Sequence, residues 1–437
     1  FEKEYFYNNQ NFIRNKIYPK DPLKFYLEET ADGITNILTK NLTSLPIQIN
    51  ALYLKGMELT IDSKTIIKPI FQNNINNPIL IANFDSNTMD SLPPMNQIST
   101  SWNIFGLDST SSLTSKIWPY NQPVHKDLLR LNPNHGNFDF IYTDEKNKFI
   151  DLKSGNWVLD ESLIFPSGYI VRCNQNVTID LVNNANIISY SPLLWTGTYE
   201  NPIKVYSSDS TGQGILVINA GMESSLDHVV FSNLGNPHGS GWSITGAVTL
   251  YQSDVMILNS WFSNNRSEDA LNVVRSHCSI DNCSFTSTYS DAFDGDFVNG
   301  EIINSRFVDC KNDGVDISGS NFRLDNISFK NIGDKAVSVG ENSIMNLSNI
   351  RVDSADVCIA SKDLSEINGQ NISLKNSNKG FAVFQKKSKY GPASIIIEGL
   401  DINNIHIPYL IEESSFLIVN GKKIESFNSN VAEIIYP

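Results

Sequence analysis

The stretch that decides the fold reads Asn259-Ser-Trp-Phe262, Asn282-Cys-Ser-Phe285, Asn304-Ser-Arg-Phe307, Asn326-Ile-Ser-Phe329, Asn349-Ile-Arg-Val352 and Asn371-Ile-Ser-Leu374. The first residues of successive copies are 22 or 23 positions apart. A repeat of this period is typical of a solenoid, in which each coil packs only on its neighbours. Parallel stacking would place equivalent residues about 4.8 Å apart. We therefore expect an internal Asn ladder and a core column formed by the fourth residue of each copy.

A second strand follows each copy of the Asn motif. It reads Asp269-Ala-Leu-Asn-Val273, Asp291-Ala-Phe-Asp-Gly-Asp296, Asp313-Gly-Val-Asp-Ile-Ser318 and Lys335-Ala-Val-Ser-Val339. Alternation along a strand directs one set of side chains inward at steps of one coil, namely Leu271, Phe293, Val315, Val337, Ile359 and Phe381. These patterns predict an all-β chain whose residues 146–405 form a right-handed parallel β-helix.

The flanking regions lack the repeat. We expect residues 1–145 to form an N-terminal β-rich domain or cap, with strands between Leu52 and Ile81 and a Ser/Thr-rich loop from Ser99 to Pro123. Residues 406–437 are expected to form C-terminal capping strands that cover the last open edge. Extra residues between Ser232 and Gly246 predict a surface loop beside the second strand, where it could wall one side of a groove.

Composition restricts the possible partners. The net charge of −14 and the pI of about 4.9 make nucleic acid and anionic lipid improbable ligands. The five cysteines show no paired CxxC spacing, which argues against structural zinc, and Cys283 reads as a small core residue. No apolar run is long enough to span a membrane. The chain starts at Phe1 and reads as a trimmed form, and we expect an extracellular, periplasmic or cell-surface location.

The most informative chemistry lies on the outward side of the second strand. One outward column contains Asn272, Asp294, Asp316 and Ser338, and Asp296 lies two residues from Asp294 on the same side. Like charges about 5 Å apart oppose each other's ionisation. A calcium ion held by Asp294, Asp296, Asp316 and Asn272 would relieve the repulsion. A shared proton would instead provide an acid and a base for glycosidic cleavage, and screening by water and Lys is the alternative without function.

Several other side chains are candidates for this site. Asp313 and Lys335 occupy one column, so an ion pair is the simplest interpretation of Lys335. Lys362 lies three coils from Asp296, about 14 Å away, which suits contact with a neighbouring sugar. The candidate catalytic residues are Asp294, Asp316, Arg266, Lys335 and Lys362, and the candidate substrate-binding residues are Tyr289, His238, Trp242, Arg275 and Glu341.

The Asn ladder, the aromatic column and the acidic strand resemble the right-handed β-helix superfamily of pectate-lyase-like and polygalacturonase-like proteins, over residues 150–405. The resemblance implies a polysaccharide partner. In lyases of this type an acidic face binds calcium and a Lys or Arg abstracts a proton, and Asp294, Asp296 and Asp316 match such a face. The hydrolases use a Gly-His-Gly string and the alginate epimerases an Asp-Pro-His-Asp string, and this chain has neither.

A second likeness concerns Asp291-Ala-Phe-Asp-Gly-Asp296 and Asp334-Lys-Ala-Val-Ser-Val-Gly-Glu341, which resemble β-helix regions of spore-coat-H-like bacterial proteins. Three functions remain open at this point. The first, which we favour from the sequence, is a calcium-assisted lyase or epimerase acting on an acidic polysaccharide. The second is a glycoside hydrolase using Asp294 with Asp316 or Asp296. The third is a non-catalytic glycan-binding or structural β-helix.

Overall fold

The computed structural model describes residues 9, 21–29, 34–54, 56–61, 65–69, 78–85, 97–119, 132–239, 242–425 and 428–436. The chain divides into two compact units, Phe1–His125 and Lys126–Pro437. Each unit has its own buried apolar core. No helix within the described ranges is long and apolar enough to cross a membrane.

The first unit is an eight-stranded sheet with the order β4-β3-β7-β8-β1-β2-β6, in which β5 pairs with β3. Its strands are β1 (Leu23–Glu29), β2 (Ile34–Asn41), β3 (Ile47–Leu54), β4 (Met57–Leu59), β5 (Ile66–Ile67), β6 (Ile79–Asp85), β7 (Gln97–Ile104) and β8 (Ser111–Pro119). The loop expected from Ser99 to Pro123 is wrong for the described residues, since β7 and β8 occupy 97–104 and 111–119. Thr100 is buried on the same side of β7 as Ile98, and the Ser99 and Thr114 hydroxyls hydrogen bond between β7 and β8 at 3.0 Å, so these polar residues form part of the sheet.

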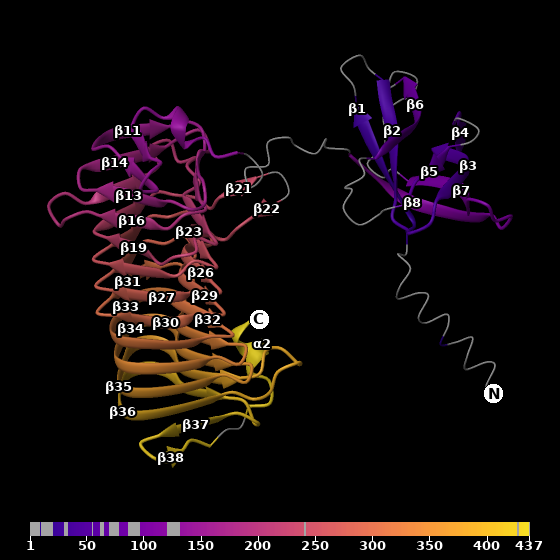
Figure 1. The fold of residues 1–437 in the computed structure, drawn as a ribbon. Coiled ribbons are helices and arrows are strands. Elements are labelled where there is room, and N and C mark those ends of the chain that lie inside the picture. Colours follow the sequence, from indigo (N-terminus) through magenta and orange to yellow (C-terminus); the bar gives the residue numbers. More distant parts are fainter. Residues whose placement is uncertain are drawn as a thin grey trace. The chain divides into compact units, whose positions relative to one another are not determined.

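The second unit is the predicted parallel β-helix, and Figure 1 shows its coils stacked into a column. Sheet 1 begins with β10 (Phe149–Leu152), β13 (Ile170–Asn174), β16 (Leu193–Thr196), β19 (Ser224–Asp227), β24 (Val255–Leu258), β27 (His277–Asp281) and β30 (Asn299–Ile303). Sheet 2 begins with β11 (Gly155–Leu159), β14 (Val177–Leu181), β17 (Ile203–Tyr206), β20 (Val229–Ser232), β25 (Trp261–Ser263), β28 (Ser284–Thr286) and β31 (Arg306–Cys310). Sheet 3 begins with β12 (Leu163–Phe165), β15 (Ile187–Ser189), β18 (Ile215–Ile218), β23 (Gly246–Tyr251), β26 (Asp269–Val274), β29 (Asp291–Asp296) and β32 (Val315–Ser318).

The later coils run through all three sheets as single bent strands. They are β33 (Asn321–Gly340), β34 (Ile344–Lys362), β35 (Glu366–Phe384) and β36 (Ser394–Ile411). At the first end, η3 (His135–Asn137) precedes β9 (Ile141–Asp144), which pairs antiparallel with β10, so the solenoid unit begins upstream of residue 146. At the other end, β37 (Phe416–Val419) adds to β36 and β38 (Lys422–Lys423) folds back on it.

The core repeats the side-chain columns that the sequence predicts. Phe262, Phe285, Phe307 and Phe329 stack with ring centroids 4.7 to 4.9 Å apart. The inward column from Leu271 to Phe381 is buried throughout. All five cysteines are buried and unpaired, so Cys283 is a core residue as predicted.

The Asn ladder exists, but its predicted burial is wrong. Asn282 Nδ2 donates to Asn259 Oδ1 at 2.7 Å and Asn326 Nδ2 to Asn304 Oδ1 at 2.8 Å, and these bonds are exposed. Each ladder Asn has a positive φ, for example 54° at Asn326, because it turns the chain from sheet 1 to sheet 2. Asn tolerates this left-handed conformation better than other side chains.

We expect Asn326→Ala to lower the free energy of unfolding by about 1–2 kcal/mol. Alanine is unfavourable in the left-handed backbone conformation of residue 326, and the hydrogen bond to Asn304 is lost. Asn326→Gly keeps the backbone conformation accessible and should be less destabilised than the Ala variant. Denaturant titration of both variants measures the difference. Equal stability of wild type and Asn326→Ala would contradict this explanation.

Candidate functional site

The outward side of sheet 3 carries one continuous column of side chains. Its first members are Ile164, Ile188 and Leu216, which pack with Trp242 and Ile244 of the loop between β20 and β23. Its last members are Ala360, Ala382 and Leu410, which pack with Val431 of α2 (Val431–Ile435). Figure 1 shows α2 against the side of the solenoid rather than at its end. The middle of the column lies between these two covers.

That middle section is polar and follows the predicted register. Asn272 pairs with Asp294, Asp294 with Asp316, and Asp316 with Ser338 across neighbouring strands. Asn272 Nδ2 donates to Asp294 Oδ2 at 2.9 Å. Within the part of the chain that the structure describes, Asp316 Oδ1 and Ser338 Oγ are buried atoms without a hydrogen-bond partner. Such atoms are costly to bury, and Lys362 Nζ, 3.8 Å from Asp316 Oδ1, offsets part of that cost by charge. The section is therefore a candidate binding site because of its buried polar groups.

A second acidic row lies where the strands of sheet 3 begin. Asp269 and Asp291 are register partners, and Asp291 Oδ1 accepts from the Asp313 backbone N–H at 2.8 Å. Asp313 Oδ1 accepts from the Lys335 backbone N–H at 2.9 Å. Lys335 Nζ lies 3.5 Å from Asp313 Oδ1 and also pairs with Asp334. Lys335 therefore forms the ion pair expected from its column. The carboxyls on this side of sheet 3 are together called the acidic face below: Asp269, Asp291, Asp294, Asp296, Asp313 and Asp316.

Lys362 belongs to the acidic face, although the sequence analysis assigned it to a neighbouring sugar. Its Nζ lies 3.8 Å from Asp316 Oδ1, and only 10% of its side chain is exposed. A Cβ built on Gly340 would lie 2.9 Å from Lys362 Cε, so the missing side chain of Gly340 provides the space that the lysine occupies. The long aliphatic stem carries the ammonium back over two coils, a reach that backbone spacing alone does not reveal.

Burial and mutual repulsion shift the acid–base behaviour of this cluster. Burial raises the pKa of Asp269 to about 8, of Asp313 to about 7 and of Asp291 to about 6. Burial, followed by the charges of Asp269 and Asp296, raises the pKa of Asp294 well above its usual range. Burial lowers the pKa of Lys335, but the attractions of Asp313, Tyr436 and Asp334 together outweigh it and the net shift is upward. The site is thus a group of partly protonated carboxyls facing protonated lysines.

We expect the protein to be less stable at pH 8 than at pH 5. Asp269, Asp291 and Asp313 hold protons in the folded state up to pH values of about 6 to 8, whereas an unfolded Asp titrates near pH ~3.9. The folded state therefore binds more protons in this window, and the free energy of unfolding falls as the pH rises through it. The upward shifts of Lys335 and Lys362 act only at more alkaline pH. Denaturant midpoints at both pH values measure the effect.

Asp269→Asn removes the titrating group with the highest of these pKa values and should flatten the pH dependence. Asp160→Asn changes the same charge at an exposed position and serves as the control. A wild-type midpoint that is higher at pH 8 than at pH 5 would contradict the predicted sign.

The remaining predicted site residues are dispersed. Arg266 donates to the carbonyls of Ser210 and Asn233 in preceding coils. Arg275 lies over the Phe297 ring, with its guanidinium carbon 5.7 Å from the centroid. Both arginines therefore contact neighbouring coils, and these contacts do not direct their guanidinium groups to Asp294.

The predicted aromatic and loop candidates also differ in their surroundings. His238 Nδ1 is 3.0 Å from the Asn236 carbonyl, and Trp242 packs on the apolar end of the sheet 3 column. Tyr289 is 70% exposed beside Asp291, and Glu341 pairs with Lys387 while contributing to the raised pKa of Asp296. Tyr289 and Glu341 stay beside the acidic face, whereas Trp242 lies on the apolar part of the column that precedes it along the chain.

The calcium hypothesis gains no geometric support. Considering the described residues only, no group of three or more His, Cys, Asp or Glu side chains is arranged to hold a metal ion. Asp294 accepts a hydrogen bond from Asn272, and its raised pKa favours the neutral form over the charged form that calcium requires. A calcium site at Asp294, Asp296, Asp316 and Asn272 therefore stays a prediction.

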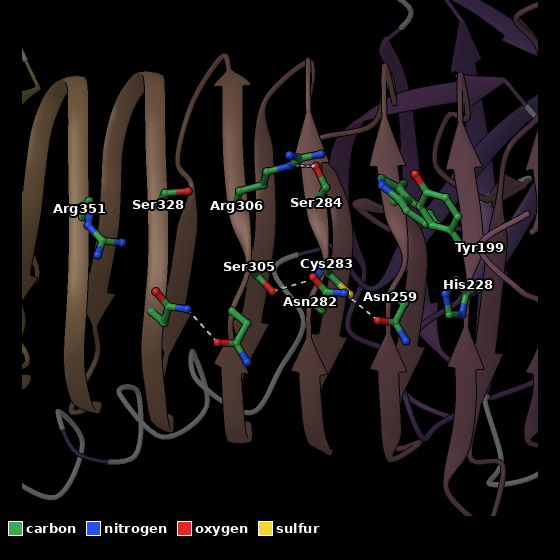
Figure 2. Close-up of a pocket in the computed structure, with 13 residues that line it drawn as sticks. Tyr199, His228, Asn259, Asn282, Cys283, Ser284, Ser305, Arg306, Ser328 and Arg351 are labelled. Atoms are coloured by element: carbon green, nitrogen blue, oxygen red, sulfur yellow. Dashed lines mark hydrogen bonds between the residues drawn. The ribbon is translucent and has the colours of Figure 1, made fainter.

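A cavity of about 430 Å³, which was not predicted from the sequence, lies on sheet 2. Figure 2 shows its residues in rows along the solenoid axis, with Tyr199 and His228 at one end and Arg351 at the other. The repeat itself indicates this row of side chains. The third residues of successive Asn motifs are Trp261, Ser284, Arg306, Ser328 and Arg351. Only their outward direction, fixed by burial of the flanking positions, shows that they form one surface.

Fold and site together define a parallel β-helix protein with a carboxyl-lined face on one sheet, which is the fold that the resemblance implied. No family model matches the chain, and no curated protein matches it.

Several solved structures are similar to the chain. The catalytic domain of a GH87 α-1,3-glucanase has 10% identity and a TM-score of 0.37, covering 91% of this chain and 98% of that one. A periplasmic alginate epimerase has 11% identity and a TM-score of 0.38, covering 66% of this chain and 80% of that one. An alginate lyase from Paenibacillus has 11% identity and a TM-score of 0.27, covering 56% and 93%. At these values the similarities assign no activity to this chain.

Proposed function

We propose that this protein is a glycoside hydrolase that cleaves a polysaccharide on the acidic face, with Asp294 as general acid and Asp316 as its carboxylate partner. The observation that carries the proposal is the direct pairing of Asp294 with Asp316 in the middle of the sheet 3 column. Their environments differ, because Asp294 is hydrogen bonded to Asn272 and Asp316 faces the Lys362 ammonium. Two adjacent carboxyls in different environments are the catalytic groups that most glycoside hydrolases use.

The raised pKa of Asp294 favours its protonated form, which a general acid requires. Asp294 donates that proton to the glycosidic oxygen as the bond to the leaving sugar breaks. Asp316 attacks the anomeric carbon or removes a proton from the attacking water, and Lys362 balances its charge. Register partners on adjacent strands are about 5 Å apart at the backbone, a spacing closer to that of retaining than of inverting enzymes. Retention of configuration is the expected outcome.

The lyase mechanism favoured from the sequence is less well supported by this geometry. Proton abstraction beside a uronate needs an unprotonated base and a positive charge for the carboxylate. Lys335 and Lys362 are buried in ion pairs, and both have a raised pKa. The surrounding carboxyls would repel a uronate at the reacting position. The proposed substrate is therefore uncharged at the sugar that is cleaved, and its polymeric nature implies action at the cell surface, in the periplasm or outside the cell.

The test is to incubate the purified protein with a panel of neutral and acidic polysaccharides and follow two products. New reducing ends without ultraviolet absorbance from unsaturated sugar, in the presence of EDTA as well as of calcium, would support the hydrolase. Unsaturated product that requires calcium would establish the lyase instead. Binding without turnover across the panel would leave a non-catalytic glycan-binding protein and overturn the proposal.

A further inference from the structure

The cavity on sheet 2 has a regular chemical pattern along the solenoid axis. Trp261 pairs with Ser284, Ser284 with Arg306, Arg306 with Ser328 and Ser328 with Arg351 in successive coils. Arginine therefore recurs at every second coil, about 10 Å apart at the backbone. Ser284 and Ser328 lie in the coils next to the arginines, and all four side chains line the cavity.

The two arginines are available to a ligand. Arg306 and Arg351 are exposed, and Arg306 Nε donates to Ser284 Oγ at 2.9 Å. That bond uses one of the five guanidinium N–H donors and fixes the direction of the group. A fixed guanidinium binds carboxylate or sulfate through two parallel hydrogen bonds.

The charge of this cavity is opposite to that of the whole chain. None of the described residues that line it is Asp or Glu, although the chain carries a net charge of −14. Acids border it: Asp227 pairs with His228 at 2.7 Å, and Asp281 and Asp325 accept from ladder Asn residues. Near Arg351, Asp353 on the same strand accepts from Asn376, and Asp401 accepts from Ser373. An anion is therefore attracted to the arginines and repelled beyond the Arg351 end.

The opposite end of the cavity offers ring surfaces. Tyr199 is 75% exposed, and the Trp261 ring lies 6.2 Å from the His228 ring between centroids. Aromatic rings of this kind present an apolar face with a polar edge, which suits the alternating C–H and hydroxyl surface of a sugar. The ladder Asn259, Asn282, Asn304 and Asn326 form the side of the cavity with amide groups.

We propose that this cavity, the arginine groove, binds an extended acidic glycan that carries an anionic group on every second sugar, with its chain parallel to the solenoid axis. Two sugars of an extended chain advance by a distance comparable with two coils, so successive anions meet Arg306 and Arg351. The terminal sugar stacks at Tyr199 and Trp261. The groove lies on sheet 2 and the acidic face on sheet 3, although the bent strand β34 carries both Arg351 and Lys362. Binding in the groove does not depend on hydrolysis at Asp294.

A hyaluronan octasaccharide, which alternates a uronate with an uncharged amino sugar, is the defined probe. Calorimetry should show binding by the full chain that weakens as salt increases. Arg306→Gln/Arg351→Gln should lower the affinity at least tenfold, whereas Lys422→Gln/Lys423→Gln, which removes two exposed charges at β38, should change it less than twofold. Asp294→Asn/Asp316→Asn should bind as the wild type does, which separates this proposal from the hydrolase.

Three results with glycans would overturn the inference, and one with RNA would replace it. They are no binding of the octasaccharide by the wild type, equal affinity of the Arg306→Gln/Arg351→Gln variant, and equally tight binding of a neutral maltooctaose. Arginine-dependent binding of single-stranded RNA that exceeds binding of the octasaccharide would assign the groove to nucleic acid instead. Both arginines lie on the surface, so each variant should keep the fold. Circular dichroism of each variant checks this.

Discussion

Asp294→Asn is expected to lower kcat on the cleaved polysaccharide by about 100- to 10,000-fold, the usual contribution of a general acid. The carboxamide has no acidic proton to donate to the leaving oxygen. It keeps the shape of the side chain and the oxygen that accepts from Asn272, so the coil should stay folded. Reducing-end release over time measures the loss, and a substrate with an activated leaving group should be less affected, because its departure needs no protonation.

Two further variants make this result specific to the pair. Asp316→Asn should cause a comparable loss on both natural and activated substrates, since Asp316 acts on the anomeric carbon or on water. Asp401→Asn, at an exposed position on sheet 2, changes the same charge and should leave kcat within about twofold of the wild type. Full activity of both Asp294→Asn and Asp316→Asn would remove the acidic face from consideration as a catalytic site.

Phe285→Ala is expected to reduce the free energy of unfolding by about 3–5 kcal/mol, the range for truncating a buried aromatic residue. The Phe285 ring is fully buried and stacks at 4.7 Å on Phe262 and at 4.8 Å on Phe307. Its removal opens a cavity in the column and interrupts the stacking of neighbouring coils. Because coils contact only their neighbours, we expect hydrogen exchange to accelerate first in the adjacent coils.

The matched control is Phe297→Ala, since Phe297 is 55% exposed and its ring lies on the surface over Gly319 with Arg275 nearby. Its effect should stay within about 0.5 kcal/mol, as is usual for surface substitutions. Chemical denaturation of both variants at one pH measures the difference. Equal destabilisation by the two substitutions would show that the aromatic column is not a principal source of solenoid stability.

The structure of the repeat explains why so much of the fold could be predicted. A 22-residue period and two-residue alternation assign each residue a coil, a sheet and a side. They predicted that Phe285 stacks on Phe307 and that Asp294 pairs with Asp316, and both are confirmed. The Asn motif predicted its own ladder, but its burial could not be read from spacing, because the positive φ at each Asn directs the amide outward at a corner.

The surroundings of the site come from parts of the chain that do not repeat. The loop carrying Trp242 and the helix α2 cover the two ends of the sheet 3 column, and neither has a periodic signal that relates it to that sheet. Lys362 reaches Asp316 only because Gly340 leaves room beneath it. Period and alternation are local properties, so the sequence by itself determined the β-helix, its core columns and the register of the acidic strand. Contacts between distant segments decide which segments cover the sheet 3 column, how far a side chain extends and how deeply it is buried. Only the tertiary structure therefore decided which carboxyls are protonated, which lysines are paired, and that a basic groove lies on sheet 2.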